Sequence, residues 1–77
     1  MSDDCVMTVS HHGRMIGALV CERRAFRLSW FAGADPRLVA YAGPLDPDTA
    51  ALADRLAARL GARSAAEAGL AVASAGL

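Results

Sequence analysis

This chain has no lysine, no excess of charge of either sign and no apolar run long enough to cross a membrane. Its eight basic residues are all arginines, and eight carboxylates balance them, so the net charge at pH 7 is zero. A neutral chain has no overall field that attracts nucleic acid or an anionic membrane. Asp3 and Asp4 precede no apolar signal segment, which predicts a cytoplasmic protein without a membrane partner.

Aromatic residues are also scarce, at 5% of the sequence. A chain of 77 residues buries only about 60% of the surface that its unfolded form exposes. We therefore expect residues 1–77 to form one small domain, in which the few aromatic side chains contribute much of the packing. These are Phe26, Trp30, Phe31 and Tyr41.

Residues that bind metals or perform nucleophilic catalysis are few. The soft-ligand candidates are Cys5, His11, His12 and Cys21. A structural zinc site needs four ligands at about 2.0–2.3 Å from the ion, usually from closely spaced pairs. The adjacent histidines instead fall at a predicted turn, and a nucleophilic cysteine would need a base and a third orienting group. We predict no metal, no cofactor and no catalytic thiol.

No other pattern points to catalysis. Asp46 and Asp48 are explained as helix-start residues, and Asp54 and Glu67 as solvated charges on helices. The glycines are scattered and form no phosphate-binding loop. A domain of this size also has little volume for a substrate cavity. The sequence therefore predicts a protein that is not an enzyme.

The stretch 5–31 alternates apolar and polar residues and has two turn-like breaks, which predicts a three-stranded antiparallel meander. His12-Gly13 suits a tight two-residue turn. That turn places Val9 opposite Ile16 and puts Leu19 on the second face of the sheet. It also puts Cys5 and Cys21 on opposite faces, which argues against a disulfide between them.

The second turn has two possible lengths. A three-residue loop, Arg23-Arg24-Ala25, places Phe26, Leu28 and Trp30 on the same apolar face as Val9. A two-residue loop places Arg27 and Ser29 there instead, because a one-residue shift in register turns every side chain to the other face. We favour the three-residue loop.

The second half of the chain predicts helices. Residues 37–42 can form a short fourth strand at an edge of the sheet. Asp46 as cap and Pro47 as first helical residue predict a helix over 47–60, which Gly61 ends. Ser64 and Glu67 have the spacing of a capping box, so we expect a weaker helix over 65–75.

Together these elements predict an α+β fold. A three- to four-stranded antiparallel meander is followed by two helices, and the first helix packs on one sheet face through leucines at four-residue spacing.

Exposed arginines and one aromatic residue are the candidate contact residues. Arginines at a hairpin tip and on a helix back can bind phosphates or an acidic protein surface. Phe31 either packs in the core or forms a contact of the kind found at binding hot spots. The predicted protein-binding residues are Arg23, Arg24, Arg27, Phe31, Arg55 and Arg59.

In size, self-contained build and lack of catalytic residues, the chain resembles the small proteins that phages use to block host defence complexes, such as anti-CRISPR proteins. The resemblance involves no sequence motif. It implies a non-enzymatic inhibitor or adaptor that occupies a surface of a larger protein or ribonucleoprotein complex. The alternatives are a nucleic-acid accessory factor that uses the arginines and a structural homodimer.

Overall fold

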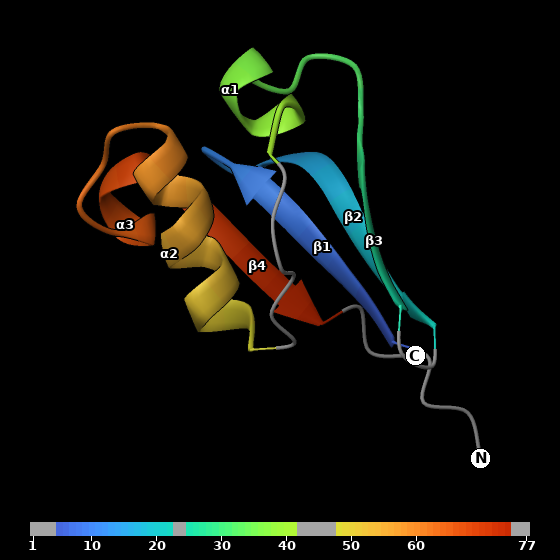
Figure 1. The fold of residues 1–77 in the computed structure, drawn as a ribbon. Helices are drawn as coiled ribbons and strands as arrows, with labels where there is room; N and C mark the ends of the chain where they lie inside the picture. The colour runs from blue at the N-terminus through green and yellow to red at the C-terminus, as the bar shows by residue number, and fades with distance from the viewer. Residues whose placement is uncertain (1–4, 23–24, 42–47, 75–77) are drawn as a thin grey trace.

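The first hairpin forms around the predicted turn. In the computed structural model, which describes residues 5–22, 25–41 and 48–74, strands β1 (Cys5–His11) and β2 (Arg14–Glu22) pair in antiparallel (Figure 1). His12 and Gly13 connect them with φ angles of 53° and 81°. Positive φ at both central residues is the geometry of a tight hairpin turn. The sequence prediction for this turn is confirmed.

The register beyond the turn differs from the prediction because β2 contains a bulge. His11 pairs with Arg14, but Val9 pairs with Gly17 instead of Ile16, and the register shifts between Val9 and Ser10. The extra residue lets β2 bury side chains that a regular strand would turn to opposite faces. Ile16 and Leu19 are both buried. The predicted placement of Leu19 on the second face is therefore wrong.

The bulge also changes which residue lies opposite Cys5 in the strand ladder. Cys5 pairs with Cys21 in the ladder between β1 and β2, so the prediction that they lie on opposite faces is also wrong.

Strand β3 (Ala25–Trp30) completes the meander. Glu22 pairs with Ala25, so two residues connect the strands and the predicted three-residue loop is wrong; residues 23–24 lie outside the described part. Leu28 nevertheless lies opposite the buried Leu19. The missed bulge and the wrong loop length each shift the predicted register by one residue. The two errors cancel on β3, so Leu28 lies on the core face as predicted.

Residues 37–41 of the predicted edge strand 37–42 do not form a strand, and residue 42 lies outside the described part. Residues 36–39 form the short helix α1 (Pro36–Val39), and the Asp35 side chain caps it by accepting a hydrogen bond from the Arg37 N–H. Pro36 fits the first helical position because it has no N–H to satisfy there. Leu38 is fully buried. The predicted edge strand is wrong because this cap and one apolar anchor favour a helical turn.

The main helix is α2 (Thr49–Arg59), within the predicted range 47–60. Its N-cap is Asp48, whose side chain accepts from the Ala50 N–H, rather than Asp46, which lies outside the described residues. Gly61 follows the last turn with a φ of 77°, as expected of a helix terminator. Leu52 and Leu56 are fully buried.

The C-terminal segment is a strand and not a helix. Ser64 caps α3 (Ala65–Ala68), whose single turn ends at Gly69 with a φ of 73°. Strand β4 (Leu70–Ser74) then pairs antiparallel with β1. The predicted helix over 65–75 is therefore wrong for residues 69–74, and residue 75 lies outside the described part. Gly69 disfavours continuation of the helix, and the edge of β1 pairs with the backbone of residues 70–74 instead.

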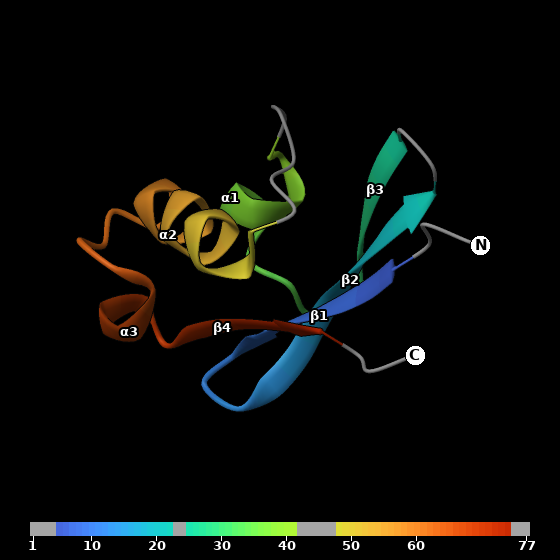
Figure 2. The same cartoon turned by 90° about the horizontal axis from the view of Figure 1, so that it is seen from below.

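The four strands form one antiparallel sheet in the order β3-β2-β1-β4. Helices α1 and α2 lie on one side of this sheet, and α3 lies beyond the start of β4 (Figure 2). The core forms between the sheet and α2, with Val9, Leu19, Leu38, Leu52 and Leu56 fully buried. The α+β class and the packing of the main helix on one sheet face are confirmed.

Candidate functional site

One face of the sheet carries no helix in the part of the chain that the structure describes (Figure 2). Its central row crosses all four strands, because Thr8 pairs with both Ala73 and Ala18, and Ala18 pairs with Ser29. We call this surface the open face. Its residues are Val6, Thr8, Ser10, Met15, Ala18, Val20, Arg27, Ser29, Phe31, Ala71 and Ala73.

The open face has large apolar side chains at one end. Met15 is 53% exposed and Phe31 is 44% exposed. Met15 lies in β2 and Phe31 directly follows β3, where its N–H donates to the Ile16 carbonyl over 2.9 Å. Exposed aromatic and methionine side chains are typical of protein-binding hot spots.

The structure separates the predicted site residues into two groups. Arg27 and Phe31 share the open face, while Arg55 and Arg59 are exposed on α2, on the other side of the sheet. Arg27 and Arg55 each take part in at least one interaction within the chain. Arg23 and Arg24 lie outside the described residues. Among the described residues, Arg27 therefore lies on a different surface from Arg55 and Arg59.

A second feature lies on the helix side, where the β1–β2 turn meets the end of α2. It is a shallow pocket of about 350 Å³, which we call the polar hollow. Its lining residues are His11, His12, Arg37, Leu60, Gly61, Ala62, Glu67 and Ala68.

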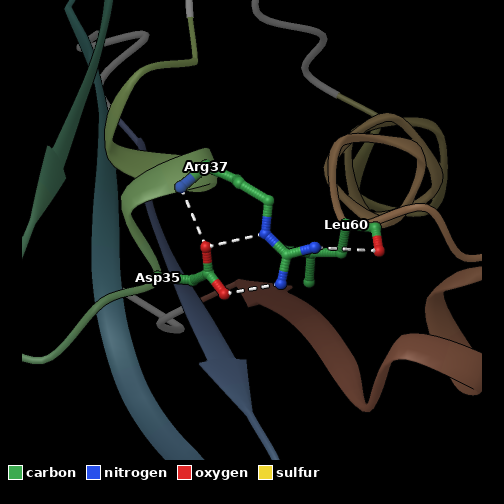
Figure 3. A network of polar contacts seen from close by, with 3 residues as sticks. All are labelled: Asp35, Arg37 and Leu60. Carbon is green, nitrogen blue, oxygen red and sulfur yellow. Dashed lines mark hydrogen bonds and ion pairs between the residues drawn. The ribbon is translucent and has the colours of Figure 1, made fainter.

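An ion pair fixes one wall of the polar hollow (Figure 3). The Arg37 Nε and Nη2 atoms donate to the two carboxylate oxygens of Asp35 over 3.0 and 2.9 Å, and Nη1 donates to the Leu60 carbonyl over 3.4 Å. The hydrogen bond from the Arg37 side chain is the largest cause that lowers the pKa of Asp35 from 3.8 to about 2. The same contact raises the pKa of Arg37.

Two histidine rings form the facing wall. The ring centroids of His11 and His12 are 4.2 Å apart, with an angle of 34° between the planes. The His12 N–H donates to the Gly69 carbonyl over 2.7 Å, and the His12 ring lies where a side chain at position 69 would stand. Gly69 thus allows the hairpin turn to pack against the α3–β4 junction.

Among the described residues, no three His, Cys, Asp or Glu side chains are grouped so as to hold a metal ion. Cys5 lies six residues before His11 along β1, a separation of about 20 Å in an extended strand, so the two belong to opposite ends of the sheet.

Sequence reasoning missed the polar hollow. The signal was present in Asp35-Pro36, a cap followed by proline at the first helical position, as at Asp46-Pro47. The prediction of a turn at Asp35-Pro36 and a strand over 37–42 leaves Arg37 out of the candidate site residues.

No protein-family model, no curated protein and no solved structure matches this chain. Within the described part of the chain, none of the helices has the length and apolar character to pass through a bilayer.

Proposed function

We propose that this chain is a non-enzymatic protein-binding module. It acts in the cytoplasm as an inhibitor or adaptor, by docking the open face of its sheet on a larger protein or ribonucleoprotein complex. The observation that supports this proposal most is the pair of exposed apolar side chains, Met15 and Phe31, on a sheet face without helices.

The composition of the open face suits such docking. Small and β-branched residues in its centre, such as Ala18, Val20 and Thr8, leave a surface without long flexible side chains, so little side-chain entropy is lost on binding. Met15 and Phe31 supply the apolar anchors at one end. Arg27 supplies a charge-assisted contact, and Arg23 and Arg24 remain proposed contacts on sequence grounds.

Arg55 and Arg59 have a secondary role in this proposal. They lie on α2, on the side of the sheet away from the open face. A partner bound to the open face can contact them only if it extends around the domain. The resemblance to anti-CRISPR proteins suggests a partner of the size of a host defence complex.

The test is affinity capture from a lysate of the organism that encodes the chain, followed by mass spectrometry with and without nuclease. We expect one discrete protein complex that survives nuclease treatment. The double variant Met15→Ala/Phe31→Ala should lose that complex. Val39→Ala is the matched control, because Val39 is 52% exposed but lies on α1 and not on the open face.

Three outcomes would contradict the proposal. Equal capture by the Met15→Ala/Phe31→Ala variant and by Val39→Ala would exclude the open face as the binding surface. Recovery that depends on nucleic acid, with affinity that falls steeply as salt rises, would support the accessory-factor alternative. Light scattering across a dilution series that shows a dimer lost in the double variant would assign the open face to a second copy of this chain.

A further inference from the structure

We propose that the polar hollow binds a guanidinium group, such as the side chain of an arginine in a peptide or a small guanidine. This site is separate from the open face, because its walls come from the β1–β2 turn, α1, the end of α2 and α3. Its volume of about 350 Å³ lies at the low end of ligand pockets, which suits a single side chain more than a larger ligand.

The first step is that Arg37 brings no net charge to the hollow. Its guanidinium is paired with the Asp35 carboxylate through two hydrogen bonds, and a third bond ties it to the Leu60 carbonyl. The Arg37 side chain therefore serves as a fixed wall.

The second step is that the remaining charge is negative. Glu67 lines the hollow, and among the described residues no basic group forms an ion pair with its carboxylate. Leu60 and Gly61 form the C-terminal end of α2, where the helix dipole places partial negative charge. With the Arg37 and Asp35 charges paired, the Glu67 carboxylate favours a cation over an anion in the hollow.

The third step is that the two adjacent histidine rings favour a planar cation. The ring of His12 rests against Gly69. The centroid of the His11 ring lies 4.2 Å from the centroid of the His12 ring, so both rings have restricted positions. A guanidinium stacks on aromatic faces and donates hydrogen bonds in its plane to a carboxylate. A compact ammonium ion gains less from such a wall.

The test is a titration followed by NMR at pH 8, where an ordinary imidazole is neutral. The probe is N-acetyl-arginine amide, and the matched control is N-acetyl-citrulline amide, which has a similar shape and no charge. We expect saturable shifts of the Glu67 and Ala68 amides and of the His11 and His12 rings with the arginine probe only. Acetate, an anion, should bind more weakly.

A pair of variants separates the local carboxylate from general charge. Glu67→Gln should weaken binding of the arginine probe by about two- to fivefold, the range for an exposed ion pair. Asp48→Asn removes the same charge at the far end of α2 and keeps a capping side chain, so it should bind like the wild type.

The inference is overturned if the arginine probe gives no saturable shift, or if the citrulline probe or acetate binds as tightly as the arginine probe. It is also overturned if the Glu67→Gln variant binds the arginine probe as tightly as the Asp48→Asn variant does. The Met15→Ala/Phe31→Ala variant should keep its affinity for the arginine probe, since neither residue lines the hollow. Failure of this site therefore leaves the function proposed for the open face unaffected.

Discussion

At the scale of single residues, Gly17 is needed because the Trp30 ring packs directly on it, and not because the backbone adopts an unusual φ there. It pairs with Trp30 across the β2–β3 ladder. A Cβ atom at position 17 would lie 2.7 Å from the Trp30 Cε3 atom and 2.9 Å from the Ser29 carbonyl oxygen. The indole ring therefore covers the glycine, a known way to pack a glycine within a sheet.

Gly17→Ala should lower the free energy of unfolding by about 1–3 kcal/mol, the usual cost of overpacking. Urea denaturation measures this change. The cost should be smaller in a Trp30→Leu background, because the leucine side chain leaves more room over position 17. An equal cost in both backgrounds would show that the ring is not the obstacle.

The Asp35–Arg37 pair makes stability depend on pH at the acid end. The pKa of Asp35 is lowered from 3.8 to about 2 in the folded chain, so its contribution to stability is fully present above pH 3.8. That contribution is lost as the pH falls through about 2. Asp35→Asn keeps a capping side chain for α1 but loses the ion pair.

We therefore expect the melting temperature of the wild type to exceed that of Asp35→Asn above about pH 4 and to converge with it near pH 2. Thermal denaturation followed by circular dichroism over this range measures the difference. A constant gap between the two proteins from pH 5 to pH 2 would contradict the role given to this carboxylate.

At the scale of elements, the junction between α3 and β4 depends on Gly69. Its φ of 73° is similar to the 77° of Gly61, which follows α2. The two sites differ in their surroundings. Nothing lies within 4 Å of a Cβ at position 61, whereas a Cβ at position 69 would collide with the His12 ring.

This contrast allows the two costs to be measured separately. Gly61→Ala should cost about 1–2 kcal/mol, the penalty of a left-handed backbone for a residue with a Cβ. Gly69→Ala should cost more, and His12→Ala should remove the excess. If Gly69→Ala costs no more than Gly61→Ala, the turn does not pack against this junction as the structure shows.

At the scale of the whole molecule, stability depends on a core between one sheet face and α2. Leu52 and Leu56 of α2 are fully buried there, while the opposite sheet face stays partly or fully exposed. A chain of 77 residues is typically stable by about 4–12 kcal/mol. One large cavity in this core therefore removes a substantial part of the total.

Leu56→Ala should reduce the free energy of unfolding by about 2–5 kcal/mol, because it removes a fully buried side chain from the main contact between helix and sheet. Val39→Ala, at an exposed site on α1, should change it by about 0.5 kcal/mol or less. Chemical denaturation of both variants measures the contrast. Similar losses would mean that the core does not lie between α2 and the sheet.

The sequence alone determined the parts of this protein that depend on neighbouring residues. His12-Gly13 specifies the first turn through backbone geometry, and Gly61 ends α2 for the same reason. Alternation in β1 assigned Met7 and Val9 to the core face. For Phe31 the sequence left two alternatives, packing in the core or exposure, and the structure shows it exposed.

Only the tertiary structure decided the bulge in β2, the strand β4 and the polar hollow. Ile16 and Leu19 are both buried in one core cluster with Leu52 and Leu56 of α2, and the bulge is what turns both of them toward that core. Residues 70–74 pair with β1, which lies more than fifty positions earlier, so no local pattern records that choice. The hollow follows from these two results, because it forms where the β1–β2 turn meets the chain that leads into β4.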